Sequence, residues 1–451
     1  MKLKELFSLF IFSGTAFLFF ISGARTGSTL VVPPWTHTYG FHKVTEYQLR
    51  LMSAFKTGFL DPEAVFCTGL KSDCDSGSTD DDDDIAIFGI NRYDNTVIYS
   101  TESGRVKVVG KDSDTVKFSE PADLTGDDCG NLFVADTGNN RIVHLRLTDG
   151  DLVFMRELKT FDGLELDSPR SIDYSGGLLF IADTGNDRIV VTSPDGKTES
   201  ILMPGTDGSR LESPISVSVV SESDDWVYYR DPFVAVADSS GKRLWKIELD
   251  NGRTTVVRYC NISGRNGAFN AIDTDYYSNI YITDRSSCCI YKFDRNLNHI
   301  ITLGKGMEGG VDFDEARDIS INRRFGQVVV LGGKGLRYFW VGTDLLHFNA
   351  SGLCYDNKAG KCSVDISFLI TEHSVVDIFL EDMNGEERLY FARDFLLPGG
   401  QFDKRIEVGG LDPVTIENYR PRLVAVAKPT YSSTDYIAIT RKSSRLKPTF
   451  R

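Results

Sequence analysis

Proline and histidine are scarce in this chain of 451 residues, which contains 14 prolines and 6 histidines. Its 50 lysines and arginines are outnumbered by 64 aspartates and glutamates, so the formal net charge is −14. We find no basic face for phosphate binding, which argues against a nucleic-acid partner. No long helical pattern appears after residue 60, whereas 41 glycines and abundant Val, Ile, Phe and Tyr are typical of short strands joined by tight turns. The composition therefore predicts an all-β fold.

Motifs for zinc binding and for a serine nucleophile are also absent from the sequence. No Cys-x-x-Cys pair occurs, the histidines are scattered, and there is no Gly-x-Ser-x-Gly elbow. The eight cysteines suit an oxidising compartment and favour structural disulfides over a metal site. One bond is expected from Cys260 to Cys288 or Cys289, which leaves Cys129 without an evident partner. Two further local pairs are expected, Cys67 with Cys74 and Cys354 with Cys362.

The first 24 residues have the pattern of an export signal. Lys2 and Lys4 precede an apolar run from Leu6 to Ile21, and small residues at positions 22–24 suit cleavage after Ala24. An uncleaved membrane anchor is the alternative, although the run is short for a span of about 20 apolar residues. The mature protein is therefore expected to be secreted, periplasmic or at the cell surface, with no membrane span.

One segment recurs along the chain with few changes. Residues 134–142 read VADTGNNRI and residues 181–189 read IADTGNDRI. Aligned on the arginine, six copies follow one another at steps of 36, 47, 55, 46 and 48 residues. In the regular copies an apolar strand ends at Asp, and Gly and Asn reverse the chain. The Arg that opens the next strand is expected to pair with this Asp. The repeat residues with this structural role are Asp136, Arg141, Asp183, Arg188, Asp238 and Arg243.

A second motif precedes each arginine. It reads PADL at 121–124, PRSI at 169–172 and PISV at 214–217, with weaker copies at 62–65, 269–272 and 316–319. A proline suits the start of a strand at which no ladder hydrogen bond is needed. We expect these segments to form the innermost strands, which line a central channel.

The repeats resemble those of the NHL-repeat family of six-bladed β-propellers. The resemblance rests on VADTGNNRI, IADTGNDRI, VADSSGKRL and the strand starts SPRSI and SPISV, and it covers about residues 45–342. It implies a propeller over residues 25–342, in which residues 42–49 are expected to supply the strand that closes the last blade. The last two copies are degenerate, because Cys289 and Gly332 replace the expected Arg and Asp.

The first repeat carries a strongly acidic insertion. Asp73, Asp75, Thr79 and Asp84 follow the spacing of a calcium-binding loop, but Ser78 stands where glycine is needed. A solvated acidic loop is the favoured interpretation, and weak calcium binding is the alternative. No other cofactor is expected.

After residue 342 the repeat stops, and strands alternate with turns to about residue 445. This pattern predicts a small antiparallel β-sandwich over residues 343–445. The order of strand, VDIFLEDMNG (376–385), LPGG (397–400) and strand resembles the immunoglobulin-like domain of flagellar hook-capping proteins. The basic segment Arg441–Lys447 is expected to be frayed, and residues 446–451 are expected to form a tail outside the sandwich.

The candidate site is the channel mouth, where the innermost strands of all units begin. Its carboxylate and amide side chains could hold one divalent cation, as in metal-dependent propeller hydrolases, because hard cations prefer oxygen ligands. Arg170 and Arg317 would place positive charge beside such an ion, so ion pairs that rigidify the channel are the favoured interpretation. A lyase with histidine-bound zinc is a further alternative, but no histidine is expected to face the channel. The candidate residues are Glu63, Asp123, Arg170, Ser171, Asn270, Arg317 and Asp318.

The sequence favours an exported, non-enzymatic binding scaffold that presents the faces of a propeller to a protein or a glycan. A metal-dependent hydrolase or lyase with a cation at the channel mouth is the alternative. Aromatic residues in the loops are either binding anchors or packing between blades. They are Trp226, Tyr228, Tyr229, Tyr276 and Tyr277.

Overall fold

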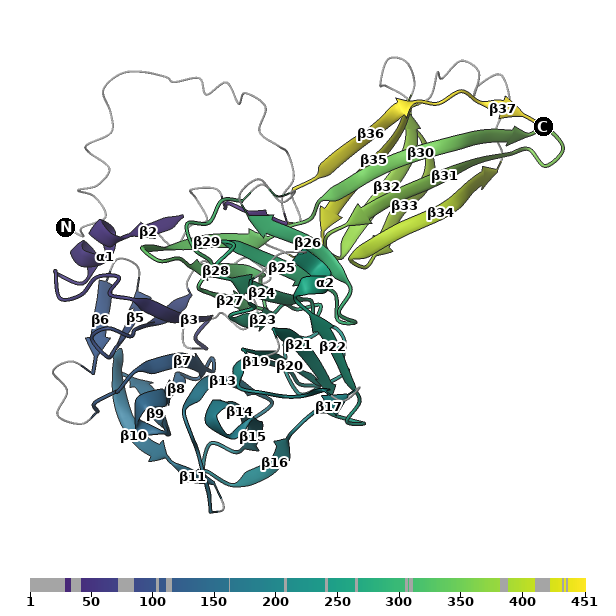
Figure 1. The fold of residues 1–451 in the computed structure, drawn as a ribbon. Helices are drawn as coiled ribbons and strands as arrows, with labels where there is room; N and C mark the ends of the chain where they lie inside the picture. The colour runs from purple at the N-terminus through teal and green to yellow at the C-terminus, as the bar shows by residue number, and fades with distance from the viewer. Residues whose placement is uncertain are drawn as a thin grey trace, which may run out of the picture.

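A computed structural model shows the architecture of the protein (Figure 1). Nearly all elements in it are strands, so the prediction of an all-β fold is confirmed. The expected signal segment, most of the acidic insertion with Cys74, and the end of the VDIFLEDMNG motif lie outside the described residues. The structure describes residues 29–33, 42–71, 85–102, 105–110, 116–161, 163–206, 209–239, 242–263, 267–304, 307, 311–381, 388–409, 422–431, 434 and 437–451.

Five four-stranded antiparallel sheets follow one another along the chain. The first contains β3 (Pro62–Thr68), β4 (Ala86–Asn91), β5 (Thr96–Glu102) and β6 (Arg105–Val109). The second contains β7 (Pro121–Gly126), β8 (Asn131–Asp136), β9 (Arg141–Thr148) and β10 (Asp151–Leu158). The third contains β13 (Pro169–Ser175), β14 (Leu178–Asp183), β15 (Arg188–Thr192) and β16 (Thr198–Leu202). The fourth contains β19 (Pro214–Val220), β20 (Phe233–Asp238), β21 (Arg243–Glu248) and β22 (Thr254–Arg258). The fifth contains β23 (Ile272–Thr274), β24 (Ile280–Asp284), β25 (Cys289–Phe293) and β26 (His299–Gly304).

The sixth sheet is completed by the start of the described chain. Its strands β27 (Asp318–Asn322), β28 (Gln327–Leu331) and β29 (Gly335–Val341) are joined by β1 (Leu30–Val31) and β2 (Lys43–Thr45), which both pair with β29. Residues 42–49 were expected to close this sheet as one strand. They contribute only the short strand β2, because a helix begins at Glu46.

Helix α1 (Glu46–Met52) follows β2 because the sequence carries a capping box at this point. The Thr45 hydroxyl accepts the Gln48 N–H, and the Gln48 side chain accepts the Thr45 N–H at 2.8 Å. The other α-helix, α2 (Cys260–Ser263), is a single turn. No helix in the described part of the chain is both long and apolar enough to cross a membrane.

The six sheets lie around a common centre (Figure 1). The first strand of each sheet contacts the first strand of the next, and β27 of the sixth sheet contacts β3 of the first. A buried apolar cluster fills every space between neighbouring sheets, including the space between the sixth and the first. Because both faces of the middle strands are buried, they read as continuous apolar runs such as residues 132–135. We call this assembly the ring, and its arrangement is that of a β-propeller.

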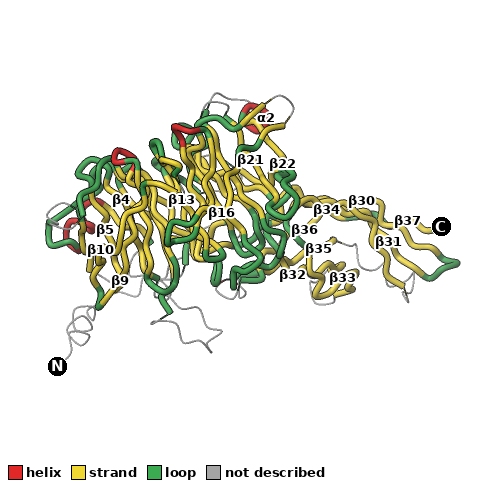
Figure 2. The backbone as a smooth tube through the Cα atoms, turned by 90° about the horizontal axis from the view of Figure 1, so that it is seen from below, coloured by secondary structure: helices red, strands yellow, loops and turns green. Residues whose placement is uncertain are grey.

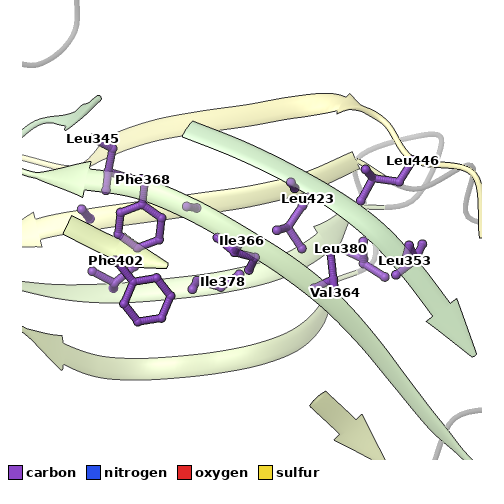
Figure 3. Packing of buried hydrophobic residues seen from close by; sticks show 14 of the residues in the cluster. Leu345, Leu353, Val364, Ile366, Phe368, Ile378, Leu380, Phe402, Leu423 and Leu446 are labelled. Atoms are coloured by element: carbon purple, nitrogen blue, oxygen red, sulfur yellow. The ribbon is translucent and has the colours of Figure 1, made fainter. Parts of the chain in front are cut away.

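Residues 345–450 form a second unit, the C-terminal unit, which extends to one side of the ring (Figure 2). One sheet has the order β34 (Gly400–Gly409), β31 (Lys361–Ile370), β30 (Leu345–Asp356) and β37 (Thr449–Phe450). The other has the order β33 (Arg388–Leu397), β32 (Ser374–Glu381), β35 (Arg422–Pro429) and β36 (Ile439–Arg445). Apolar side chains of both sheets, among them Ile366, Phe368 and Ile378, pack into one core (Figure 3).

The end of the chain is ordered, so the expectation of a frayed tail is wrong. Leu446 is buried in the core of the C-terminal unit, and β37 pairs with β30. This pair is parallel, whereas the other strand pairs of the described residues are antiparallel. The tail is held because Leu446 packs into this core and β37 forms ladder hydrogen bonds with β30.

The expected disulfides are not found among the described cysteines. Cys354 on β30 lies opposite Ser363 on β31, and Cys362 lies opposite Tyr355. This offset of one residue places the two thiols on opposite faces of the sheet, where they cannot be joined. Cys67 is buried, and its thiol donates to a carbonyl of β27. The free thiols among the candidates are Cys67, Cys260, Cys288, Cys354 and Cys362.

Candidate functional site

The Asp and Arg of the repeat meet inside the hairpin turn. Asp136 is fully buried at the end of β8, and its Oδ2 accepts from Arg141 Nε at 2.7 Å and from Asn139 Nδ2 at 2.9 Å. Its Oδ1 accepts the Ser119 N–H at 2.7 Å. Asn140 completes the turn in the left-handed region, with φ of 50°. The carboxylate therefore fixes the turn and ties it to the segment before β7.

Two further copies of the repeat use the same pairing. Arg188 Nε lies 2.7 Å from Asp183 Oδ2. In the fourth sheet Arg243 Nη1 lies 3.3 Å from Asp238 Oδ2, which also accepts the indole N–H of Trp245 at 2.9 Å. All three carboxylates are fully buried, so they serve the fold and are not open to a ligand.

The first strands of the ring enclose a central cavity of about 1030 Å³. Its described lining carries nine carboxylate and four basic side chains, so its composition is acidic. The first strands run in the same direction, which makes the two ends of the cavity different. We call the end at which these strands begin the Glu63 end, and the end at which they finish the Trp226 mouth.

Polar side chains on the first strands connect neighbouring sheets. Asp123 Oδ2 accepts the Ile172 N–H at 3.0 Å and the Ser171 hydroxyl at 2.6 Å. Asp318 Oδ2 accepts the Val65 N–H at 2.6 Å, which joins the sixth sheet to the first. We call these contacts latches. They provide acceptors for backbone N–H groups that have no ladder partner on the cavity side.

A second tier of latches lies two residues further along the strands. Asp173 Oδ2 accepts the Val219 N–H at 2.7 Å, and Asp273 Oδ2 accepts the Ile321 N–H at 2.6 Å. These four latches join the second sheet to the third, the third to the fourth, the fifth to the sixth and the sixth to the first. Their carboxyls are therefore engaged in the fold.

Burial changes the protonation of the latch carboxyls. It raises the pKa of Asp123 to about 7 and that of Asp273 to about 7, although Arg323 opposes the rise at Asp273. The pKa of Asp318 is raised well above its ordinary value, first by burial and then by the neighbouring Asp123. The interior of the cavity is consequently less negative at acid and neutral pH than its composition indicates.

Arg323 is the main cation inside the cavity, and the sequence analysis did not single it out. Its Nη2 donates to the Val219 carbonyl at 2.7 Å and to Thr274 Oγ1 at 2.6 Å, and its Nη1 lies 3.0 Å from Asp224 Oδ2. Arg323 thus bridges three sheets. It stands directly after the strand motif of the sixth sheet, but nothing in its spacing indicates these partners.

Ion pairs occupy the Glu63 end. Glu63 Oε1 lies 3.3 Å from Arg170 Nη2 and 3.6 Å from Arg92 Nη1. Arg317 Nη1 lies 2.7 Å from Asp61 Oδ1. The Glu63–Arg170 pair joins the first and third sheets, and the Arg317–Asp61 pair joins the sixth and first sheets. Ion pairs between sheets restrict the movement of this end of the cavity.

The four residues considered as metal ligands have separate roles. Asp123 accepts from β13, and Asp318 accepts from β3. Glu63 belongs to the ion pairs, and the Asn270 side chain donates to the backbone carbonyl of Arg317. The described residues contain no group of three or more His, Cys, Asp or Glu side chains that could hold a metal ion. No step of chemistry through a cation follows from this geometry.

The Trp226 mouth has an exposed aromatic ring at its rim. Trp226 lies in the loop after β19 and is 45% exposed, and the Arg324 guanidinium lies over its ring, 5.1 Å from the centroid. The exposed Asp225 precedes it, and Asp128 pairs with Lys71 at 3.0 Å across the lining. A ring that is backed by a cation and open to solvent offers a stacking surface for a planar group.

The other aromatic candidates contact the C-terminal unit. Tyr277 stacks on His373 with ring centroids 3.8 Å apart, and Tyr229 Oη lies 2.9 Å from His373 Nε2. Tyr228 packs edge-on against Tyr229, and Tyr276 packs edge-on against Tyr277. These four tyrosines contact one another or His373 at the junction between the ring and the C-terminal unit, although Tyr228 stays 48% exposed. Trp226 is the candidate anchor because, of the five aromatic residues, it is the one that lines the cavity.

A buried charged cluster lies at the same junction. Lys292 on β25 and Glu372 between β31 and β32 are fully buried and form an ion pair, and Lys292 Nζ lies 3.9 Å from Asp275 Oδ2. Asn279 Nδ2 donates to Asp275 at 2.9 Å and to Glu372 at 3.1 Å. Burial by itself raises the pKa of Glu372, but the charges and hydrogen bonds of Lys292 and His373 together outweigh it, and the pKa falls to about 2. Glu372 is therefore ionised at physiological pH and needs its partner.

No family model matches this sequence, and no curated protein matches it. The solved structure of a streptogramin B lyase is 14% identical, with a TM-score of 0.42 over 62% of this chain and 93% of that chain. The WD40 repeats of RRP9 are 11% identical, with a TM-score of 0.43 over 69% and 99%. A catalytically inactive virginiamycin B lyase from Staphylococcus aureus with quinupristin is 16% identical, with a TM-score of 0.40 over 57% and 77%. These are propeller-type proteins, and nothing about the activity of this chain follows from such values.

Proposed function

We propose that this protein is an exported, non-enzymatic binding protein that takes its ligand at the Trp226 mouth. The ring is then a six-bladed propeller of the NHL type, and the C-terminal unit is an immunoglobulin-like sandwich that spaces or docks it. The observation that carries the proposal is the exposed Trp226 ring, backed by Arg324, at the rim of a cavity of about 1030 Å³.

The roles of the other polar groups support this choice of site. The inner carboxyls are engaged in latches, and the charged side chains of the Glu63 end are engaged in ion pairs. A ligand at either place would have to break contacts that hold the ring. At the Trp226 mouth it can stack on an existing surface at no such cost.

The expected ligand is a protein segment that carries positive charge. Beyond the ends of the first strands the lining has four aspartates, Asp127, Asp128, Asp224 and Asp225, and three basic side chains, Lys71, Arg323 and Arg324. This excess of negative charge does not include the latch carboxyls whose pKa is raised, and it favours the entry of cations. The indole face suits a planar guanidinium or an aromatic side chain. A glycan would use the same indole face but would gain nothing from the charge.

Trp226→Ala tests the proposal by isothermal titration against synthetic peptides. The panel contains Lys/Arg-rich peptides, acidic peptides of equal length, and neutral oligosaccharides. We expect the basic peptides to bind, and the substitution to weaken binding at least about tenfold, because a central aromatic anchor contributes about 2 kcal/mol. Tyr93→Ala is the matched control, since Tyr93 is 79% exposed and does not line the cavity.

Three other results would contradict the proposed site, the proposed ligand or the non-enzymatic role. Basic peptides that bind the wild type and Trp226→Ala equally well contradict the site. Oligosaccharide binding that depends on Trp226 would contradict the protein ligand and assign a glycan to the same mouth. Turnover of a probe that requires a divalent cation would support the alternative of a metal-dependent hydrolase or lyase.

Export rests on the sequence, in which Lys2, Lys4 and the apolar run to Ile21 form a signal segment. Cleavage after Ala24 gives a mature protein that begins at Arg25. N-terminal sequencing of the protein recovered outside the cytoplasm tests this position.

A further inference from the structure

The loop that carries Trp226 also contacts the C-terminal unit. Trp226 lies at the rim of the cavity, and Tyr228 and Tyr229 follow two and three residues later in the same loop. Tyr229 Oη lies 2.9 Å from His373 Nε2, and the Tyr228 ring centroid lies 5.9 Å from that of His373. The position of the Trp226 loop is therefore set in part by a residue of the other unit.

The loop that carries Arg324 is supported in the same way. Arg324 lies over the Trp226 ring, and Gly326 follows two residues later. Gly326 has a φ of 69°, and a Cβ added there would lie 2.8 Å from the Tyr431 ring. Tyr431 belongs to the C-terminal unit and is buried, so this loop is packed directly against it.

The C-terminal unit is held in place by the ion pair of Lys292 and Glu372. Both side chains are fully buried, and the only other carboxylate that an ion pair brings to Lys292 within the described residues is Asp275, at 3.9 Å. A charge this deeply buried is strongly destabilising when its partner is removed. Glu372 also accepts from Asn279, so one side chain of the C-terminal unit satisfies two groups of the fifth sheet.

From these contacts we propose that the C-terminal unit positions the rim of the Trp226 mouth through Glu372 and His373. Docking of the C-terminal unit on the ring is coupled to the conformation of the rim, so a change in one shifts the equilibrium of the other. Glu372 and His373 are positioning residues, since they act on Trp226 and Arg324 through the tyrosines of the junction. The consequence for ligand affinity rests on the proposed function, whereas the effect on the rim does not.

Glu372→Gln in the full-length protein tests the coupling, because it keeps the shape of the side chain and removes its charge. We measure acrylamide quenching of the tryptophan fluorescence of Trp226. Its signal is obtained by subtracting the fluorescence of a protein in which Trp226 is also replaced by Phe. The ring is already 45% exposed, so loosening of the loop should raise its quenching constant by at most about twofold. Limited proteolysis between β29 and β30 reports separately whether the C-terminal unit has been released.

Glu381→Gln is the matched control, because Glu381 lies on β32 of the same unit and pairs with Lys442 at the surface, at 2.7 Å. It should change neither measurement. Tyr229→Phe is the second variant if Glu372→Gln does not fold, since it removes only the hydroxyl that contacts His373. Release of the C-terminal unit with unchanged quenching of Trp226 overturns the proposal. Because no ligand is used, this result does not depend on whether the proposed function is correct.

Discussion

At the scale of single residues, carboxylates hold this protein together by accepting backbone N–H groups. Asp136 accepts one N–H and two side-chain donors inside a turn, and Asp123 accepts an N–H of the next sheet. The contact between Asp136 and Arg141 is charge-assisted and therefore stronger than a neutral hydrogen bond. For both aspartates, a buried donor that loses its acceptor is costly. The same residue type therefore serves two different structural purposes within one repeat.

Asp136→Ala should be among the most destabilising substitutions in the ring. It leaves Arg141 and the Ser119 N–H without their buried acceptor, and breaking a buried pair of this kind costs about 3–5 kcal/mol. The free energy of unfolding in urea measures the effect. Asp151→Ala is the control, because its exposed pair with Lys107 should contribute no more than about 1 kcal/mol. Equal losses in the two variants would show that the turn is not held by its carboxylate.

The inner aspartates Asp123 and Asp318 show why a binding site could not be located from the sequence alone. Asp123 and Asp318 were candidate ligands because an acidic residue at a strand start beside a channel has the chemistry to bind a cation. Their partners are N–H groups of Ile172 and Val65, and a backbone group leaves no trace in the amino-acid pattern. The pairing of the Asp and Arg in the regular turns could be predicted from the sequence, because both residues lie within one short hairpin.

At the scale of the elements, the first strands combine two requirements that conflict. Each first strand must line the cavity, and it must also supply hydrogen-bond acceptors to the first strand of the next sheet. The second requirement buries carboxyl groups where they are poorly hydrated. Burial raises the pKa of Asp123 to about 7 and of Asp273 to about 7, from an ordinary value of 3.8. The strands consequently make stability dependent on pH.

We expect the latch carboxyls to stabilise the folded ring most at acid pH. Their folded pKa is raised, so their contribution is full below about pH 4 and is lost as the pH rises through about 7. Glu372 acts in the opposite direction and at lower pH, because its folded pKa is about 2 and its contribution is lost as the pH falls towards that value. The latches should therefore lower the urea midpoint of the protein as the pH is raised from about 4 to 7.

Asp273→Asn isolates this contribution, since asparagine does not titrate in this range. The pH dependence of its urea midpoint should be flatter than that of the wild type between about pH 4 and 7. Asp195→Asn is the control, because Asp195 lies in an exposed turn. Identical slopes for Asp273→Asn and the wild type would rule out titration of this carboxyl in the window.

The elements themselves were predictable where the repeat is regular. The turns after β8 and β14 carry Gly and Asn at the positions that reverse the chain, and the strand starts carry proline. Helix α1 was missed because it has only seven residues, although Thr45 and Gln48 form a capping box that the sequence shows. Cys354 and Cys362 were paired by their spacing, whereas the register of β30 and β31 sets them on opposite faces.

At the scale of the whole molecule, the start of the described chain is part of the sixth sheet. Leu30 on β1 is 1% exposed and belongs to the cluster between the fifth and sixth sheets. The ring thus depends on a segment that lies more than three hundred residues from its partner strand, Val341 being paired with Leu30.

Leu30→Ala should destabilise the ring although it lies far along the chain from the other residues of its cluster. Loss of a buried leucine side chain costs about 2–5 kcal/mol, measured by urea unfolding. Val32→Ala is the matched control two residues away, because Val32 is 54% exposed and its loss should change stability by no more than about 0.5 kcal/mol. A Leu30→Ala protein as stable as the control would show that β1 does not contribute to the ring.

The junction between the two units is the feature that the sequence indicates least. Lys292 and Glu372 are 80 residues apart, and each is an ordinary charged residue in a strand or turn. The turn that presents Asp275 and Asn279 has the spacing Asp-x-x-x-Asn, which recurs at Asp127 and Asn131 with the same hydrogen bonds. That spacing predicts the turn but not its contact with another unit.

The latch from Asp318 to Val65 spans 253 residues of chain, which has a consequence for biosynthesis. The first sheet emerges early during translation, yet one of its sides acquires its neighbour only when the sixth sheet has been made. Contacts of such long range form late and slow the folding of β-rich domains, and an unpaired sheet face is prone to aggregate in the meantime. The order of synthesis therefore leaves the nascent chain dependent on protection until its last strands arrive, and ring closure is the step at which that dependence ends.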